Sequence, residues 1–160
     1  MKTIVIGLGN PILSDDGVGI YIARELMHRL KDRDVDIIET SCTGLYMLDL
    51  LKGYDRAILI DAIQTIDGKA GQIYELEEES FKTSCHSTNP HDIDIVNALD
   101  LARKLNLPVP EDITFYAVEV ENVTTFSEKC SPEVVVAINT CTETIMKALS
   151  CDESIALGKQ

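Results

Sequence analysis

The chain has 160 residues, of which 45% are hydrophobic and 26% are charged, as expected for a single globular domain with one core. Apolar runs such as 57–60 fall far short of the roughly 20 residues that a membrane span needs, so we expect none. The net charge is −13, and after residue 105 three lysines stand against nine acidic residues. Because Lys and Arg contacts to phosphate supply most nucleic-acid affinity, this composition argues against a nucleic-acid partner.

The start of the sequence and the number of cysteines favour a reducing, cytoplasmic compartment. Strand-like sequence begins within two residues of Met1 and leaves no room for a secretory leader, so we expect a cytoplasmic protein. Five cysteines are an odd number, and none forms a CxxC pair. This pattern favours reduced, partly buried thiols over a disulfide framework or a structural zinc site.

The first half of the chain alternates predicted strands with predicted helices. Ser14 or Asp15 could cap the first helix, in which apolar residues recur at four-residue spacing. Asp61 follows the third strand. The expected strands are 2–7, 35–39 and 56–60, and the expected helices are 14–30 and 45–51.

The second half begins with a predicted edge strand. Residues 72–76 alternate as a half-solvated strand does, and we expect this strand to run antiparallel at the edge of the sheet. An irregular polar segment, 81–92, holds two of the three histidines. A helix over 94–105, a strand over 113–118 and a helix opened by Ser131-Pro132-Glu133 follow, and Ser131 is the expected cap.

These elements predict a single three-layer α/β domain. Strands that alternate with helices imply right-handed crossovers, hence a twisted, mainly parallel sheet with one antiparallel edge strand and helices on both faces. We place this domain at 1–149 and a polar C-terminal tail at 150–160.

Ligands in such sheets usually sit beyond the carboxyl ends of the strands, where two acids and a histidine are expected to gather. Asp16 and Asp61 follow strands that plausibly neighbour one another, and His91 precedes a helix that should pack on the same sheet. Two carboxylates and an imidazole suit a divalent cation with open positions for water or substrate. Structural roles for the same residues remain open: a helix-dipole contact, bonds to loop amides and a satisfied loop histidine.

Two rival sites are weaker. Gly7-x-Gly9 follows a strand as in a dinucleotide site, but Ile12 occupies the third small-residue position and two acids would repel a pyrophosphate. A tight turn with positive φ would explain the glycines equally well. Cys85 and His86 are adjacent in sequence, whereas a nucleophile and its base must face each other across a site.

Three segments together resemble the hydrogenase maturation proteases, the endopeptidases that remove a C-terminal extension from the large subunit of nickel-iron hydrogenases. The segments are GLGNPILSDDGVG at the start, LIDAI around Asp61 and NPHD around His91. The resemblance runs in order from Lys2 to about Leu149. It implies a phosphorylase/hydrolase-like α/β domain in which Asp16, Asp61 and His91 are the metal-contacting and catalytic residues.

The resemblance also implies an unusual substrate. The family acts on the large-subunit precursor after nickel has been inserted, so nickel arrives with the substrate instead of being permanently bound, and other divalent metals could fill the site in vitro. We expect a monomer. Asp15 and His86 are candidates for supporting roles. Cys42 stands where the family usually has a glycine-rich turn, which would place an extra sulfur near the cleft.

Two alternatives share parts of this pattern. Peptidyl-tRNA hydrolases also begin with GLGNP, but they continue into a different motif with a catalytic histidine, and the acidic charge disfavours tRNA. A nickel-sensing chaperone that binds the immature large subunit without cutting it would use the same three residues. Only an activity measurement separates this chaperone from a protease.

Overall fold

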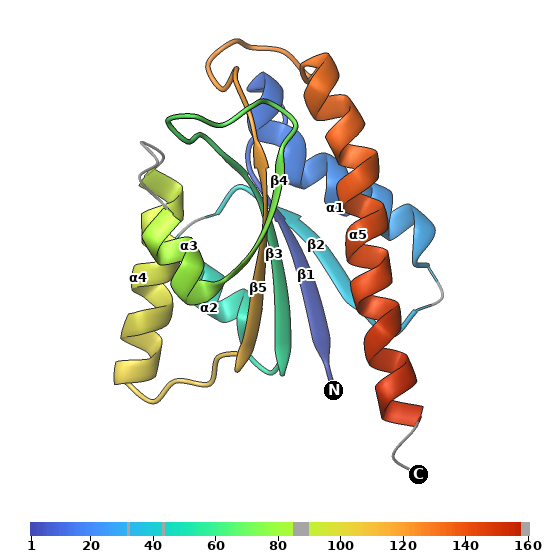
Figure 1. Cartoon of the computed structure of the whole chain (residues 1–160). Coiled ribbons are helices and arrows are strands. Elements are labelled where there is room, and N and C mark those ends of the chain that lie inside the picture. Colours follow the sequence, from blue (N-terminus) through green and yellow to red (C-terminus); the bar gives the residue numbers. More distant parts are fainter. Residues whose placement is uncertain (32, 43, 85–89, 158–160) are drawn as a thin grey trace.

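The computed structural model describes residues 1–31, 33–42, 44–84 and 90–157, with side chains for 1–31, 33–42, 44–81 and 95–151. Its centre is a five-stranded sheet in the order β2-β1-β3-β5-β4 (Figure 1). The strands are β1 (Thr3–Leu8), β2 (Asp36–Thr40), β3 (Arg56–Ile63), β4 (Ile73–Glu77) and β5 (Asp112–Glu119). All neighbouring pairs are parallel except β4 and β5, which confirms the predicted antiparallel edge strand.

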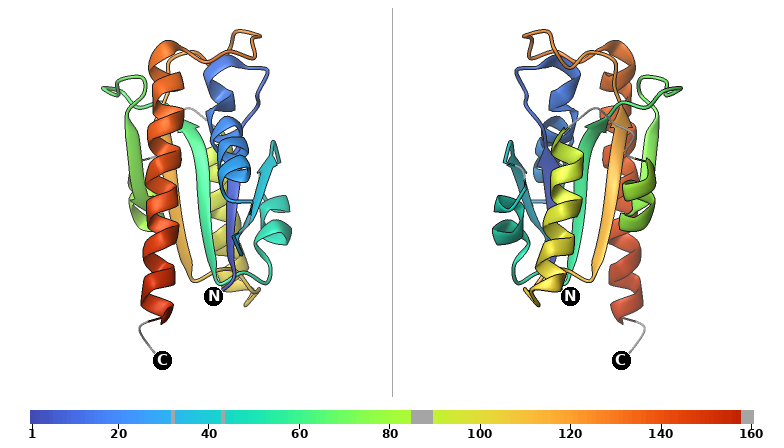
Figure 2. Two further views of the ribbon diagram at one scale, coloured as in Figure 1. Left: turned by 90° about the vertical axis from the view of Figure 1, so that its right-hand side faces the viewer. Right: turned by 90° about the vertical axis from the view of Figure 1, so that its left-hand side faces the viewer.

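Helices cover both faces of the sheet, as predicted (Figures 1 and 2). Helices α1 (Val18–Arg29) and α5 (Pro132–Leu157) pack on one face, where the core includes Val5, Ile58 and Val118. The other face carries α2 (Tyr46–Leu51), α3 (Glu78–Ser84) and α4 (Pro90–Lys104), over a core that includes Ile4 and Leu59. Strands β1 and β3 are buried throughout, as expected for strands covered on both sides.

The glycines of the first loop serve two different purposes. Gly9 has φ +136, and a Cβ there would lie 2.0 Å from the carbonyl oxygen of Asp16, so the turn requires glycine as expected. Gly7 instead lets α1 approach the sheet, because its Cβ would lie 2.3 Å from the carbonyl oxygen of Gly19. A turn with positive φ therefore explains Gly9 only.

Two helices differ from the sequence prediction. Helix α3 extends into the segment 81–92 that we predicted as irregular, and α4 begins at Pro90, four residues earlier than expected. Proline at the first helical position is a known start signal, because its missing N–H has no partner to lose there. Helix α5 runs on to Leu157 although we expected a tail from Ser150. The sequence offers no helix breaker before Gly158.

Helix α5 is also the element that our count of apolar runs overlooked. Its segment Pro132–Cys151 has a mean hydropathy of 1.2, which by length and composition alone would suffice to cross a membrane. One face of this helix lies in the core through Val134, Ala137, Cys141 and Ile145. The core helix of an α/β domain meets the same criterion, so the segment is not by itself a sign of a membrane.

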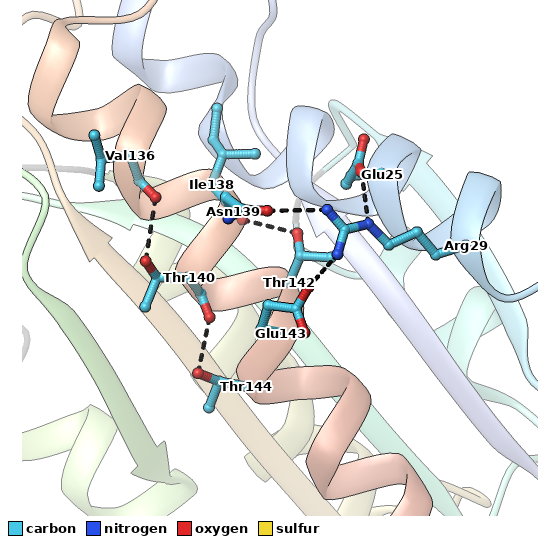
Figure 3. A network of polar contacts seen from close by, with 9 residues as sticks. All are labelled: Glu25, Arg29, Val136, Ile138, Asn139, Thr140, Thr142, Glu143 and Thr144. Carbon is cyan, nitrogen blue, oxygen red and sulfur yellow. Dashed lines mark hydrogen bonds and ion pairs between the residues drawn. The ribbon is translucent and has the colours of Figure 1, made fainter.

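Polar side chains on the outer surface join α1 to α5 (Figure 3). Arg29 donates hydrogen bonds to Glu25 on its own helix and to Asn139 and Glu143 on α5. The carboxylates of Glu25 and Glu143 raise the pKa of Arg29 further above its usual value. Because the cluster is solvent-exposed, salt should screen it, and the apolar contacts beneath it hold the two helices together.

Candidate active site

A cavity of about 140 Å³ lies at the carboxyl edge of the sheet, on the face covered by α2 and α4. It brings together Asp16 from the loop after β1 and Asp61 from β3, which are 45 positions apart in sequence. The convergence expected for these two acids is therefore observed. The full lining is Leu8, Gly9, Asn10, Leu13, Asp16, Ser41, Cys42, Met47, Asp61 and Ile95.

Asp61 is held by the sheet itself. Strand β3 extends to Ile63, so Asp61 lies within the strand and pairs with Ala117 of β5, whereas we expected it just beyond the strand end. Its side chain is 9% exposed, and its Oδ1 accepts a hydrogen bond of 2.8 Å from the N–H of Ala62. A carboxylate on a central strand has little freedom to move, which suits a group that must hold a fixed position.

Asp16 is held by the glycine-rich loop. It belongs to a short 3₁₀ helix, η1 (Ser14–Gly17), and its Oδ2 accepts a hydrogen bond of 3.1 Å from the N–H of Asn10. The same N–H lies 3.2 Å from the carbonyl oxygen of Asp16. Asn10 also lines the cavity, and our sequence analysis assigned it no role. The signal was present in Gly9-Asn10-Pro11, a turn sequence that ends five positions before Asp16.

Asp15, the neighbouring acid, points elsewhere and is fully buried. Its carboxylate accepts hydrogen bonds from the backbone N–H groups of Glu121, Asn122 and Ser131 and from the hydroxyl of Ser131. Burial opposes ionisation, but the hydrogen bonds led by Ser131 outweigh it and lower the pKa of Asp15. Asp15 therefore supports the site by fixing the loop 120–131.

The predicted side-chain cap of the first helix is wrong, whereas the last helix starts where we expected it to start. Helix α1 has Gly17 at its N-cap and no side-chain cap, since Asp15 is engaged with the distant loop and the Ser14 hydroxyl donates to the carbonyl oxygen of Thr125. Helix α5 begins at Pro132, so Ser131 stands at the predicted cap position, where its carbonyl oxygen accepts from the N–H of Val135 and its hydroxyl donates to Asp15. These side chains bind distant segments, which local capping rules do not anticipate.

Glu119 is a further buried carboxylate, to which we assigned no role from the sequence. It is 2% exposed at the end of β5 and accepts hydrogen bonds from the backbone N–H and the hydroxyl of Thr65 and from the hydroxyl of Tyr74. Gly68 lies against the same carboxylate, since a Cβ there would be 2.0 Å from its Cδ. Glu119 thus fixes the loop 64–72 that follows β3.

The predicted histidine contact lies partly outside the described structure. His91 lies in the first turn of α4, but its side chain is outside the described residues, as are Cys85 and His86 altogether. Within the described side chains no three His, Cys, Asp or Glu residues are grouped so as to hold a metal ion. The metal site formed by two acids and a histidine thus remains a prediction. The structure places both of its acids, Asp16 and Asp61, in one cavity.

The cysteines of the described chain are free thiols. Cys42 is exposed and lines the cavity, as expected for a sulfur near the cleft. Burial raises the pKa of Cys130 to about 11 and that of Cys141 to about 12, so both thiols stay protonated at neutral pH. The expectation of reduced, partly buried cysteines is confirmed for these two.

Comparison with known proteins places this chain in a family. Residues 20–148 match the family model described as hydrogenase maturation protease. The hydrogenase 2 maturation protease of Escherichia coli is 26% identical over 125 residues, which are 77% of this chain and 76% of that protein.

Solved structures agree in fold. The hydrogenase maturating endopeptidase HybD of E. coli has a TM-score of 0.80 at 24% identity, over 95% of this chain and 94% of that one. HybD from Thermococcus kodakarensis has a TM-score of 0.75 at 22% identity, over 92% and 99% of the two chains.

The fold and its acid-lined cavity, together with these matches, define an α/β protease. The chain belongs to the hydrogenase maturation protease family. Its role is that of an endopeptidase in hydrogenase maturation.

Proposed function

We propose that this endopeptidase removes the C-terminal extension from the nickel-loaded large-subunit precursor of a nickel-iron hydrogenase, and that it recognises the bound nickel. The observation that carries this proposal is the meeting of Asp16 and Asp61 in one cavity at the carboxyl edge of the sheet. Carboxylate oxygens are good donors to a divalent ion, and the open cavity lets an ion that arrives with a protein substrate reach them.

His91 is the proposed third contact. Helix α4 supports this role because position 91 lies four residues before Ile95, which lines the cavity. Positions four apart share one face of a helix, so a helix that continues regularly from Ile95 would carry position 91 on the same face. An imidazole with two carboxylates leaves part of the coordination sphere of nickel to the precursor.

In this proposal nickel is part of the substrate. The cavity accommodates an ion and its immediate ligands, while the extension must lie along the opening. Asp16 and Asp61 hold the nickel and thereby place the scissile bond beside the sheet edge. Precursor without nickel would lack this anchor. We further propose that the protein acts as a cytoplasmic monomer, and that other divalent ions can occupy the site in vitro.

The test compares nickel-loaded with nickel-free precursor. We expect incubation with the purified protein to shorten only the nickel-loaded precursor, by the mass of its extension, as measured by intact-mass spectrometry. Equal cleavage of both forms would contradict nickel recognition. Binding to the loaded precursor without a change of mass would identify a chaperone and refute the protease assignment for this substrate.

Cys42 offers a chemical test of the cavity. Because its thiol is exposed and lines the cavity beside the acids, we expect a bulky maleimide on Cys42 to block processing at least tenfold. The Cys42→Ser variant, treated identically, should keep its activity, which controls for modification of other cysteines such as the exposed Cys151. Full processing by protein whose Cys42 is shown by peptide mass mapping to be modified would exclude this cavity.

A further inference from the structure

The segments at the carboxyl ends of the parallel strands include stretches that differ in composition from the rest of the chain. Segments 8–14, 41–48, 62–66 and 122–127 contain no Asp, Glu, Lys or Arg, although 26% of the chain is charged. Each segment lies at or just beyond the carboxyl end of one of the mutually parallel strands β1, β2, β3 and β5. The segments 8–14, 62–66 and 122–127 gather at one end of the molecule, at the top in Figure 1.

Large apolar side chains project from these uncharged loops. Phe126 is 81% exposed, Ile66 is 88% exposed and Ile12 is 48% exposed. We call these three residues the neutral rim. The loops that bear Ile12 and Phe126 adjoin the cavity, since Leu13 lines the cavity and the Ser127 N–H donates to the carbonyl oxygen of Ile12. Exposed apolar groups beside a site commonly mark a protein-binding surface.

The loops that carry the rim are held in place by buried carboxylates. Asp15 accepts hydrogen bonds from both ends of the loop that bears Phe126. Glu119 accepts from Thr65, beside Ile66, and from Tyr74 of β4, the strand that follows the loop. The side chain of Gln64 joins the two loops through the carbonyl oxygen of Glu121. Apolar groups fixed in advance lose little conformational entropy on binding, which is the condition for high affinity.

We infer that the neutral rim is the docking surface for the folded body of the large-subunit precursor, and that it binds an apolar, uncharged patch of that protein. The inference rests on the proposed function. A second copy of this chain fits less well, because two molecules of charge −13 repel each other. The same charge disfavours an anionic membrane. A precursor seated on the rim would bring its extension to the adjoining cavity.

The test uses Phe126→Ser and Ile66→Ser with nickel-loaded precursor. We expect each substitution to raise KM about tenfold, as the loss of a large interface side chain does, with kcat unchanged. The control is the double variant Leu105→Ser/Leu107→Ser, whose side chains are exposed at the end of the molecule away from the cavity. All variants should unfold like the wild type, because the altered side chains are exposed.

Three outcomes would separate the two proposals. Wild-type protein that leaves the loaded precursor uncut refutes the proposed function. Wild-type cleavage with unchanged KM in both rim variants refutes the docking surface alone. A wild-type dimer in sedimentation that both rim variants dissociate would assign the rim to a second copy and also refute it. A binding measurement that does not depend on turnover can be made in protein that also carries Asp61→Asn. In that background Phe126→Ser and Ile66→Ser should each raise the Kd for the precursor about tenfold.

Discussion

Asp61→Asn is expected to reduce processing of the nickel-loaded precursor at least a hundredfold while the protein stays folded. The substitution removes the negative charge from the cavity and leaves a weaker donor for a divalent ion. An amide oxygen can still accept the hydrogen bond from the N–H of Ala62, so the free energy of unfolding should fall by only about 1 kcal/mol. Intact-mass time courses and urea unfolding measure the two quantities.

Matched controls are available for both predicted contacts. Asp67→Asn makes the same change on an exposed residue of the next loop and should process normally. His91→Ala should abolish processing, whereas His28→Ala, on the exposed surface of α1, should not. If processing survives both Asp61→Asn and His91→Ala, the proposed site is wrong.

Asp15→Ala is expected to lower the free energy of unfolding by about 3–5 kcal/mol, because it leaves part-buried donors of Ser131, Asn122 and Glu121 without the acceptor that they share. Asp16→Ala, one residue later, removes the hydrogen bond from the N–H of Asn10 at a half-buried position and should cost less, on the order of 1 kcal/mol. Of the two adjacent acids, Asp15 should thus mainly affect the stability of the fold and Asp16 mainly the processing activity. Equal destabilisation by both substitutions in urea unfolding would contradict this division.

The pKa of Asp15 gives the same prediction a pH dependence. Its pKa is lower in the folded protein than the ordinary value of 3.8, so ionised Asp15 stabilises the fold above that pH. This contribution is lost as the pH falls below 3.8 toward the folded-state pKa. Between pH 6 and pH 3 the free energy of unfolding, measured in urea, should fall less steeply with pH for Asp15→Ala than for the wild type. The same pH dependence in both proteins would contradict this role of Asp15.

Much of this architecture could be predicted from the sequence, because strands buried on both faces are apolar runs and parallel strands bring their carboxyl ends together. That reasoning placed Asp16 and Asp61 at one edge before any coordinates. It could not show which of the two adjacent acids faces the cavity, since this depends on Ser14, whose φ of 52 turns the backbone, and on a partner at Ser131. Glu119 was missed because Thr65 and Tyr74, which donate to it, lie about 50 positions away.

The central claim, that Asp16, Asp61 and His91 meet around one divalent ion, is tested most directly by anomalous diffraction from crystals soaked in nickel. We expect one strong peak in the cavity. The carboxylate oxygens of Asp16 and Asp61 and a ring nitrogen of His91 should each lie about 2.0–2.2 Å from the nickel ion, the range for borderline divalent ions. A peak bound elsewhere, or one in the cavity with the ring of His91 turned away from it, would contradict the claim.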